Sequence, residues 1–589
     1  MIATVWRVAG VGFSLLIILM AGLLYGADPG QADFLNSTVG DLTIGFAVRT
    51  DDLTVLLLAV VGVIATCVQV YSLGYLHQRA ASYHALVTLF TAAMVTVVVS
   101  DSLFFLLIGW EVMGACSYLL ISHYWERRDA RSGAVKAFLM TRLGDVGFLF
   151  GIFVLGVGAG TFRISELDPA AISPGVLTTG TLLLLVGVVG KSAQVPLQTW
   201  LPDAMPGPSP VSALIHAATM VAAGVFLIAR LYNVFSASET TMTVLAVIAC
   251  VTMLFAALCA MAAVEVKRVL AWSTVSQLAI MFSALSLGTA EGRHAALFHL
   301  VTHAAFKGLL FLCAGVLLHQ VGSAAFVVLR RYTRRGRLRN ALRVTFITMT
   351  VGLAALAGVP GFAGFFSKDT ILEAAWEHGR HDGSVVGWIV LGSVGLTAAL
   401  TAFYCTRMWL WVFFRTPALA GAVGAFEDDD AAIADLDEPD TTKLRDAPWV
   451  MLTPLILLAL AAIGLGYADG VHLNWVIGLV SVALVLLGAL PAYSLWSRGA
   501  DPRPVVLERE FGVDAAYGGL FVVPISRLAR LTVAGDRDVI GGYVRAAGRT
   551  GTLVSQGMRR LQTGNVQTYL TAAVIGVVAL AVLAGVIGS

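Results

Sequence analysis

Charged and histidine side chains lie deep inside stretches of this sequence that are otherwise apolar. They are Glu111, Arg142, Asp145, Lys191, His216, Glu265, Lys267, Arg268, His299, His303, Lys307, Lys368, Asp369 and Arg407. An ionisable group at the depth of a bilayer core is expensive, so each one needs a partner, water or a function to explain it. Glu111 and Lys191 cannot reach an interface at low cost, and we predict a functional role for both.

Simpler explanations stay open for several of the other groups. Arg142 and Asp145 lie at i and i+3, which predicts a local ion pair that holds helices together. A lone His216 is typical of a hydrogen-bonded core histidine. Long basic side chains near helix ends can extend to the interface, and this applies to Lys136, Arg230, Arg268 and Arg407.

Three of the buried groups recur at a spacing of four residues in "FHLVTHAAFKGLLF". His299, His303 and Lys307 therefore share one helix face, and they extend over about 12 Å at the helical rise of roughly 1.5 Å per residue. Two histidines one turn apart can bind zinc, but no third ligand is evident and the lysine would repel the cation. A row of groups that exchange protons fits better, because imidazole titrates near neutrality.

Two of the lysines lie close to prolines that interrupt apolar stretches. Lys191 precedes Pro196, and Lys368 follows Pro360 in "GVPGFAGFFSKD". A broken helix frees backbone carbonyls and admits water, which lets an ammonium group exist at that depth. Five spans separate the two breaks, so a five-helix unit repeated once would be inverted in the membrane. Inverted repeats with broken helices are typical of ion transporters.

The elements that must position these residues are membrane-spanning helices. Of the 589 residues, 58% are hydrophobic and only 13% charged, and the mean hydropathy is +0.84. About 20 apolar residues cross a bilayer, and the apolar stretches predict an all-α polytopic membrane protein with about 15 transmembrane helices. The predicted spans are 5–25, 52–75, 81–100, 102–122, 133–157, 176–198, 209–234, 239–262, 266–286, 293–318, 340–378, 385–412, 447–468, 472–494 and 566–588. The cysteines lie inside these stretches without a CxxC pair and are interpreted as core residues.

The charges of the connecting loops predict the orientation. Alternate loops collect "HYWERRDARSG", "EVKR" and "RRYTRRGRLRN" on one side, which the positive-inside rule makes cytoplasmic. The N-terminus is then cytoplasmic and the C-terminus extracytoplasmic. Apolar residues and arginines recur near helical spacing in 505–562, which predicts an amphipathic lateral helix on the cytoplasmic membrane surface. A loosely ordered basic loop is the alternative, because several glycines follow residue 534.

These features divide the chain into seven predicted segments. They are N-terminal helices at 1–101, a first repeat at 102–234, a second repeat at 239–412, an acidic cytoplasmic loop at 413–446, two helices at 447–494, the lateral helix at 505–562 and a final helix at 566–588. The whole predicts a protein that moves protons or other cations. The sequence has no glycine-rich phosphate loop, no defensible quinone pocket and no set of redox ligands, so no metal or cofactor is expected in this chain.

Several longer motifs resemble a known family. They are "LIGWEVMGACSYLLI", "KAFLMTRLGDVGF", "GKSAQVPLQTWLPDAMPGPSPVSALIHAATMVAAGVFLIAR", "KRVLAWSTVSQL", "FHLVTHAAFKGLLFL" and "GFFSKDTIL". Over residues 40–412 they resemble the antiporter-like L subunits of proton-pumping NADH:quinone oxidoreductase, respiratory complex I. The same core is similar to the large subunits of Mrp-type cation/proton antiporters and of membrane-bound hydrogenases. The C-terminal helices favour the complex I subunit.

The resemblance implies a hydrophilic axis of buried groups that moves protons through a bacterial inner membrane. The matching positions are Glu111, Asp145, Lys191, His216, Lys267, His299, His303, Lys307, Lys368 and Asp369. It also implies a translocase subunit without a redox centre, with flavin, iron–sulfur clusters and quinone in partner subunits. The expected partners are other membrane-arm subunits, contacted through the helix bundle and the lateral helix. No nucleic acid is expected.

The resemblance further implies how the axis works. Glu111 would face Lys191 and stabilise its ammonium, and Asp145 would lie near a channel entrance. A change in that pairing would release the proton through His216 toward the second half of the chain. An Mrp-type Na+/H+ antiporter subunit is the alternative, and a structural scaffold with inactive channels is a third possibility. The family has one more helix before the segment that starts here at Val5, so the chain is expected to begin one helix late.

Overall fold

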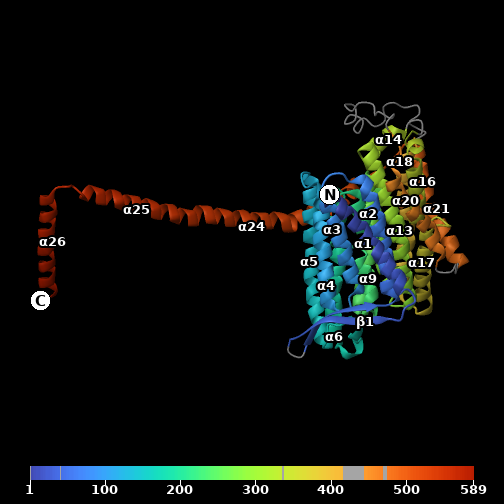
Figure 1. Cartoon of the computed structure of the whole chain (residues 1–589), viewed down its shortest axis with the longest axis horizontal. Helices are drawn as coiled ribbons and strands as arrows, with labels where there is room; N and C mark the ends of the chain where they lie inside the picture. Colours follow the sequence, from blue (N-terminus) through green and yellow to red (C-terminus); the bar gives the residue numbers. More distant parts are fainter. Residues whose placement is uncertain (1, 40–41, 334–336, 416–443, 469–473, 589) are drawn as a thin grey trace. The chain divides into compact units, whose positions relative to one another are not determined.

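The chain folds into two compact units, Met1–Phe511 and Gly512–Ser589. The computed structural model describes residues 2–39, 42–333, 337–415, 444–468 and 474–588. Within these residues, fourteen helices are long and apolar enough to cross a membrane, judged by length and composition. The prediction of a helical polytopic membrane protein is therefore confirmed (Figure 1).

The first unit begins with a helix, a β-hairpin and four more long helices. Their bounds are α1 Ile2–Leu24, β1 Gly30–Val39, β2 Leu42–Thr50, α2 Asp52–Tyr75, α3 Ala80–Val99, α4 Leu103–Ile121 and α5 Arg128–Ala159. The strands pair antiparallel, with Gly30 opposite Thr50, and lie across the lower end of the bundle in Figure 1. This hairpin was not predicted. Helix α2 begins where the Asp51 carboxylate accepts the Thr54 N–H at 2.9 Å and satisfies a free donor of the first turn.

Five helices follow, and two interruptions of predicted spans lie among them. Their bounds are α6 Pro174–Lys191, α7 Trp200–Asp203, α8 Ser209–Ala217, α9 Ala223–Arg230 and α10 Tyr232–Ser236. The end of α6 at Lys191 agrees with the break predicted before Pro196. The gap at 218–222 was not predicted, since 209–234 was expected to be one span. No proline marks this gap, and the Thr219 hydroxyl donates to the Leu214 carbonyl at 2.5 Å, which satisfies one freed acceptor.

The second half of the first unit contains the most deeply buried helices. Its elements are α11 Glu239–Ala262, α12 Val266–Leu285, α13 Ala290–Val321, α14 Phe326–Thr333, α15 Arg337–Ala341, α16 Arg343–Ala357, α17 Ala363–His381 and α18 Val385–Phe413. Helices α12 and α13 are buried along almost their whole length, although both carry charged or titratable side chains. Pro360 lies in the gap between α16 and α17, which confirms the second predicted break.

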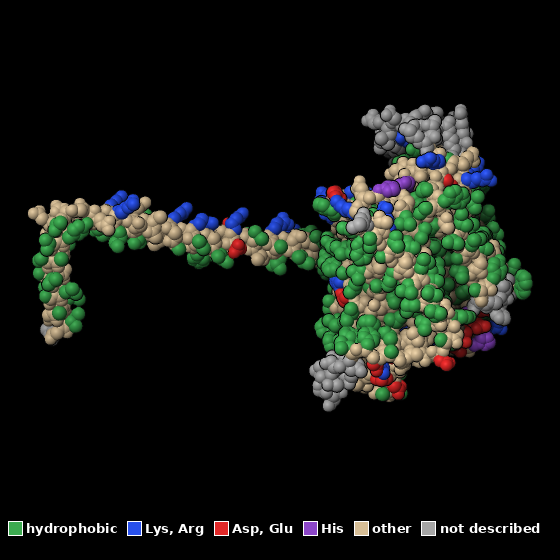
Figure 2. Space-filling model, in the orientation of Figure 1, with side chains coloured by type: hydrophobic (Ala, Val, Ile, Leu, Met, Phe, Trp, Pro, Cys, Tyr) green, Lys and Arg blue, Asp and Glu red, His purple; other side chains and the backbone are tan. Residues whose placement is uncertain are grey.

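The remaining helices complete the first unit and form the second. They are α20 Trp449–Gly464, α21 Trp475–Ser497 and α22 Val505–Glu508, then α23 Val513–Tyr517, π-helical η9 Gly518–Val522, α24 Val523–Ala534, π-helical η10 Gly535–Ile540, α25 Gly541–Leu561 and α26 Val566–Ile587. Residues 513–561 are thus helical rather than a loose loop. Figure 2 shows Lys and Arg side chains along one face of this helix and hydrophobic ones along the other, the pattern of an amphipathic helix.

The predicted spans and the candidate membrane helices do not correspond one to one. The spans 209–234 and 340–378 are both interrupted, so neither is among the fourteen candidates. One of the fourteen, Glu510–Leu561, lies in the predicted lateral helix. Most of the predicted acidic loop, 416–443, lies outside the described residues. Exposed hydrophobic side chains cover the flank of the first unit (Figure 2), which is the surface that a bilayer would contact.

Candidate proton-transfer site

Lys191 ends helix α6 inside the bundle and pairs with an aspartate of α5. Its Nζ lies 3.3 Å from Oδ2 of Asp145, and the exposed fractions of the two side chains are 0% and 4%. The other oxygen of Asp145 accepts a hydrogen bond from Nε1 of Trp110 at 2.7 Å. A Cβ atom on Gly114 would lie 2.7 Å from the Lys191 Nζ, so glycine leaves room for the ammonium. A buried ion pair needs such extra hydrogen bonds to offset the loss of water.

Glu111 pairs with Arg142 rather than with Lys191. Its carboxylate forms an ion pair with the Arg142 guanidinium, which also donates to the Glu111 backbone carbonyl at 3.2 Å. Nη1 of Arg142 lies 3.5 Å from Oδ2 of Asp145, which confirms the predicted i, i+3 pair. The implied direct pairing of Glu111 with Lys191 is corrected: Asp145 is the carboxylate beside the lysine. The close packing of α5 on α6 at Gly144, where a Cβ would lie 3.0 Å from the α6 backbone, brings these two residues together.

The segment that follows Lys191 carries polar side chains without partners. Oε1 of Gln194, Oε1 of Gln198 and Oγ1 of Thr199 are buried and have no hydrogen-bond partner in the part of the chain that the structure describes. Buried polar atoms normally have a partner, and ordered water is the usual one where the protein supplies none. The break therefore creates a polar environment next to the lysine.

Contacts of α7 and of Lys267 fix the segment that follows the break. Trp200 Nε1 donates to the Gly190 carbonyl at 3.0 Å, one residue before the lysine that ends α6. Lys267, in the first turn of α12, donates to the carbonyls of Met205 and Gly207, the latter at 2.8 Å. Lys267 is buried, and these two carbonyls are where its ammonium is bound. The structure therefore places it at the end of α7 and not in the row on α13.

His216 lies in the last turn of α8, directly before the unpredicted interruption. Its buried ring lies 4.7 Å from the Phe311 ring of α13, and its Nδ1 has no partner among the described residues. Ser192 donates to the Val221 carbonyl at 2.8 Å, inside the interruption. The end of α6 therefore touches the gap between α8 and α9, and His216 lies between that gap and α13.

His299, His303 and Lys307 are all buried on α13. Nδ1 of His299 lies 2.9 Å from the Ser367 hydroxyl of α17, and its ring centroid lies 6.2 Å from that of His303. Lys307 donates to the Ser273 hydroxyl of α12. Both ring nitrogens of His303 and Nε2 of His299 have no partner within the described ranges. Across those same ranges, no group of three or more His, Cys, Asp or Glu side chains could hold a metal ion.

Lys368 reaches back from α17 to the end of α16. Its Nζ donates to the Leu356 carbonyl, in the last turn of that helix, where the partial negative charge of the helix end favours a cation. The Lys368 side chain is buried. Asp369 lies beside it in sequence but points toward α21, where its carboxylate accepts a hydrogen bond from Ser481. The second break thus holds its lysine with backbone carbonyls, whereas the first uses a carboxylate.

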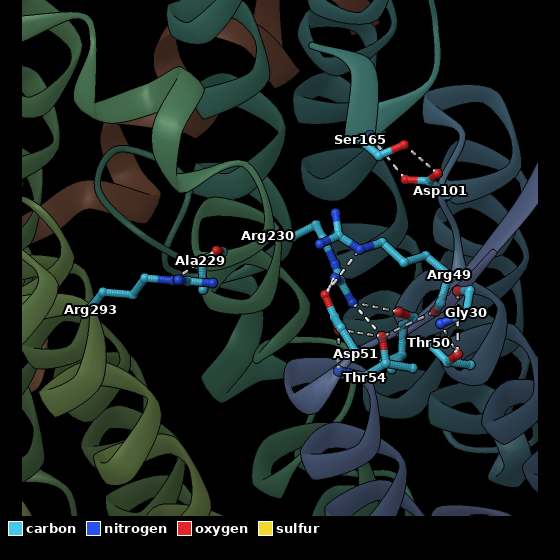
Figure 3. Close-up of polar contacts among 11 residues, drawn as sticks. Gly30, Arg49, Thr50, Asp51, Thr54, Asp101, Ser165, Ala229, Arg230 and Arg293 are labelled. Carbon is cyan, nitrogen blue, oxygen red and sulfur yellow. Dashed lines mark hydrogen bonds and ion pairs between the residues drawn. The ribbon is translucent and has the colours of Figure 1, made fainter. Parts of the chain in front are cut away.

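Two arginines that were expected to extend to the interface are buried in ion pairs instead. Arg230 lies 2.6 Å from Asp51 and 2.7 Å from the Thr54 hydroxyl (Figure 3). Burial alone would raise the pKa of Asp51, but Arg230 and the hydrogen bonds from Thr54 hold that pKa below its usual range. Arg407 binds both oxygens of Asp501, at 2.6 and 2.8 Å. Both arginines join distant parts of the chain, because buried charges need partners.

Sequence reasoning missed several residues that hold the predicted ones in place. Trp110 and Gly114 lie four residues apart, so they share one helix face. This spacing is a signal that helix geometry alone could have revealed. Ser273 and Ser367 carry no such signal, since serine in a buried helix most often bonds to its own backbone.

Two family models match the chain. One, described as "NADH:quinone oxidoreductase/Mrp antiporter, TM", covers residues 100–395. The other, described as "NADH-Ubiquinone oxidoreductase (complex I), chain 5 N-terminus", covers residues 37–85. The first model alone covers just over half of the chain and includes most of the buried ionisable residues described above.

Relatives are similar to the chain over nearly its whole length. NADH-quinone oxidoreductase subunit L of Mycobacterium tuberculosis is 36% identical over 578 residues, which are 92% of this chain and 86% of the relative. NAD(P)H-quinone oxidoreductase chain 5 of Synechocystis is 33% identical over 626 residues, covering 94% and 90% of the two chains. F(420)H(2) dehydrogenase subunit L of Methanosarcina mazei is 36% identical over 611 residues, covering 90% and 87%.

Two solved structures share the fold. The Mrp complex from Dietzia matches with a TM-score of 0.68 at 24% identity, over 100% of this chain and 61% of that chain. The membrane-bound sulfane sulfur reductase, an archaeal respiratory membrane complex, matches with a TM-score of 0.66 at 23% identity, over 83% and 94%. At these identities the likeness concerns the fold. Together with the family model and the relatives at 36% identity, it places the chain in the NADH:quinone oxidoreductase/Mrp antiporter family of membrane proteins.

Proposed function

We propose that this chain is the proton-translocating membrane-arm subunit of an NADH:quinone oxidoreductase. Its relatives include subunit L and chain 5 proteins of NADH- and NAD(P)H-quinone oxidoreductases. Its own buried acids, lysines and histidines supply proton-binding groups inside a bundle of apolar helices. The chain then works as one subunit of a translocase, and the redox reaction belongs to partner subunits that hold flavin, iron–sulfur clusters and quinone.

The observation that carries this proposal is the buried pair of Lys191 and Asp145 at the end of a broken helix. A lysine in such a place exists either as an ammonium held by its carboxylate or as a neutral amine that has given up its proton. Asp145 contacts two cations, Lys191 at 3.3 Å and Arg142 at 3.5 Å. A shift of Asp145 toward Arg142 weakens the hold on the lysine and favours release of the proton.

Glu111 acts on this switch through Arg142. When Glu111 holds the guanidinium, Asp145 is left to Lys191, and the ammonium is stabilised. When a neighbouring subunit draws Glu111 away, Arg142 competes for Asp145, and Lys191 releases its proton. The role that the sequence resemblance gave to Glu111 is therefore kept, but it passes through Arg142 and Asp145.

The released proton passes to His216 and then along α13 toward the second break. His216, His303 and His299 each have a buried ring nitrogen without a partner in the described chain. Water at these nitrogens would connect them, since polar cavities of this kind hold water. Lys307 lies on the same face, and Lys368 receives the proton beside the end of α16. Asp369 lies next to it, and Lys267 positions the end of α7 at the start of the path.

The change in proton affinity that this switch produces can be compared with the work of moving a proton across a membrane. Moving one proton across a membrane costs about 2.3 kcal/mol per 100 mV of potential. A tenfold change in proton affinity is worth about 1.4 kcal/mol. A change of roughly a hundredfold or more in the proton affinity of Lys191 therefore covers the electrical work. Removing the carboxylate of a buried ion pair is a change of that size or larger.

The arrangement of the whole chain follows from the two breaks. The segments 102–234 and 239–412 are two inverted repeats, in which Lys191 and Lys368 take corresponding places. The basic loops and the N-terminus face the cytoplasm, and the C-terminus faces the outside of a bacterial inner membrane. The other proposed segments are the helices at 1–101 and 447–494, the acidic cytoplasmic loop at 413–446, the lateral helix at 505–562 on the cytoplasmic membrane surface, and the final helix at 566–588. The lateral helix braces the other membrane-arm subunits.

Purification from native membranes tests this function. A tagged chain is extracted in mild detergent, and its companions are analysed for flavin, iron–sulfur centres and NADH:quinone activity. We expect all three to copurify with the chain in one large assembly. Recovery of small membrane subunits alone would contradict the proposal and indicate an Mrp-type antiporter.

A further inference from the structure

The first unit ends in an unusual backbone turn. Glu510, Phe511 and Gly512 all adopt left-handed conformations, with φ of 52°, 57° and 73°. Only glycine adopts this region without steric cost, so the two residues before Gly512 must be held there by other contacts. The long helix of the second unit starts at the next residue, Val513. The position where the compact bundle ends is therefore fixed by side chains.

Those side chains contact α11 and α12. The Glu510 carboxylate is 9% exposed, forms an ion pair with Arg268 and accepts a hydrogen bond from Trp272 Nε1 at 3.3 Å. The Phe511 ring lies 5.0 Å from the ring of Phe255. A buried carboxylate with two donors and a stacked ring keep this turn in place, because buried charges are stable only when they are paired.

Arg268 also holds a second carboxylate. Its Nη1 lies 3.2 Å from Oδ1 of Asp203, while its Nη2 binds Glu510. The other oxygen of Asp203 lies 2.6 Å from Nζ of Lys136. Two cations and two carboxylates thus form one chain of ion pairs, Glu510–Arg268–Asp203–Lys136, and their charges balance. Loss of one member leaves an unbalanced charge next to Asp203.

Asp203 is the last residue of α7, and the first residue of α7 contacts the end of α6. Trp200 donates to the carbonyl of Gly190, which precedes Lys191. A Cβ on Gly133 would lie 2.1 Å from the Asp203 carbonyl, so α5 packs directly against the end of α7. Only one rigid turn of helix therefore separates the ion pairs of Asp203 from the backbone that carries Lys191.

We propose that Glu510 is a positioning residue for Lys191, acting through Arg268, Asp203 and α7. The Glu510 carboxylate keeps Arg268 balanced between Glu510 and Asp203, so a change in this pairing shifts α7 and biases proton release at Lys191. This inference rests on the proposed function, but its first test does not. The second lysine, Lys368, binds a carbonyl of α16, and neighbouring Asp369 binds Ser481 of α21; neither contact includes this network.

Amide hydrogen exchange of the assembled complex tests the link directly. In Glu510→Gln, Arg268 loses its charged partner and draws Asp203 away from Lys136. We expect exchange at residues 199–207 to become about fivefold faster, as local opening is favoured, while α13 keeps its protection. Glu508→Gln is the matched control, since Glu508 is exposed and its Oε1 lies 3.7 Å from Nη1 of Arg503. Unchanged exchange at 199–207 in Glu510→Gln would overturn the inference.

Charge rescue separates positioning from simple loss of packing. The double variant Glu510→Gln with Arg268→Gln removes one charge of each sign, so Asp203 and Lys136 are balanced again. We expect exchange at 199–207 to return to within about twofold of the natural protein. A double variant that opens more than Glu510→Gln alone would contradict the charge argument.

Coupling between two sites is reciprocal, which provides a second route if Glu510→Gln does not assemble. Asp203→Asn leaves the turn at 510–512 untouched in sequence, and we expect it to accelerate exchange at residues 508–513. Protons pumped per NADH are measured in the same variants, and we expect a loss in Glu510→Gln with an unchanged rate of NADH oxidation. If Lys191→Ala leaves pumping intact, the proposed function fails. If Lys191→Ala abolishes pumping while Glu510→Gln alters neither exchange nor pumping, this inference alone fails.

Discussion

Lys191 and Asp145 form a buried ion pair, with Nζ and Oδ2 3.3 Å apart, on two helices that pack closely through glycines. Glu111, the acid that the sequence motif suggested as the partner, pairs with Arg142 instead. The two pairs meet at Asp145, which is 3.5 Å from the Arg142 guanidinium. Asp145 should therefore affect the charge state of Lys191 more than Glu111 does, and variants of the two acids can measure this difference.

Asp145→Asn should impair proton pumping more than Glu111→Gln. The asparagine leaves a buried ammonium without a counter-ion, and such a group gives up its proton, so we expect pumping per NADH to fall by about fivefold or more. Glu111→Gln frees Arg142 to compete for Asp145 but leaves that carboxylate in the site, so we expect a smaller loss, about half that effect or less. Pumping is measured by dye quenching in inverted membrane vesicles. Asp168→Asn, on an exposed loop, is the control, and a reversed order of the two acids would refute the role of Asp145.

Gly114→Ala should displace the ammonium of Lys191 without unfolding the bundle. The added Cβ would lie 2.7 Å from Nζ, at the free end of a flexible side chain that can move away. We expect pumping to fall by about twofold or more, because the lysine loses its short contact with Asp145. Gly12→Ala is the matched control, since a Cβ there meets no atom within 4 Å. Equal pumping in both alanine variants would show that the position of the ammonium is unimportant.

Arg407→Met should destabilise the bundle rather than the proton path. It removes both short contacts of the Asp501 carboxylate, which is only 16% exposed, and leaves the longer ion pair with Arg503 at 3.8 Å, so we expect the free energy of unfolding to fall by about 3 kcal/mol. The melting temperature in detergent, followed by tryptophan fluorescence, measures it. The double variant Arg407→Met with Asp501→Leu should recover much of the loss, and exposed Arg509→Met should have little effect. A double variant less stable than Arg407→Met would contradict the pairing.

Asp51→Asn should remove a contribution to stability that depends on pH in a defined direction. The folded-state pKa of Asp51 lies below its ordinary value, despite the opposing effect of burial, because Arg230 and Thr54 favour the carboxylate. Its contribution is therefore complete above about pH 4 and is lost as the pH falls through the folded pKa. Melting curves of the natural protein and of Asp51→Asn should differ by a constant amount between about pH 5 and 8 and converge below about pH 4. A difference that grows toward low pH would contradict the assignment.

The sequence allowed those parts of the site to be predicted that follow from local chemistry. Pro196 predicted a break near the end of the span 176–198, because proline interrupts the helical hydrogen bonds, and α6 ends at Lys191, five residues before it. The four-residue spacing placed His299, His303 and Lys307 on one face of α13. Both inferences need only the geometry of one helix.

What could not be predicted depends on contacts between helices. The sequence offers two buried acids, Glu111 and Asp145, as partners for Lys191. Only the packing of α5 on α6 decides between them. The gap after His216 has no proline or glycine, so hydropathy predicted one continuous span. The pairing of Gly30–Val39 with Leu42–Thr50 was not predicted, because the prediction rested on apolar membrane spans and none covers these residues. Arg230 and Arg407 were expected at the interface because their partners are far away in sequence.

In the proposed function, Lys191 releases the proton at the first broken helix, and Lys368 receives it at the second. Replacing each lysine tests this most directly. Protons pumped per NADH oxidised are determined in inverted vesicles for Lys191→Ala and Lys368→Ala, with complex assembly checked on native gels. We predict that each variant assembles and oxidises NADH, while its pumping ratio falls to about half or less of the natural value. An unchanged ratio in assembled Lys191→Ala and Lys368→Ala complexes would contradict the account.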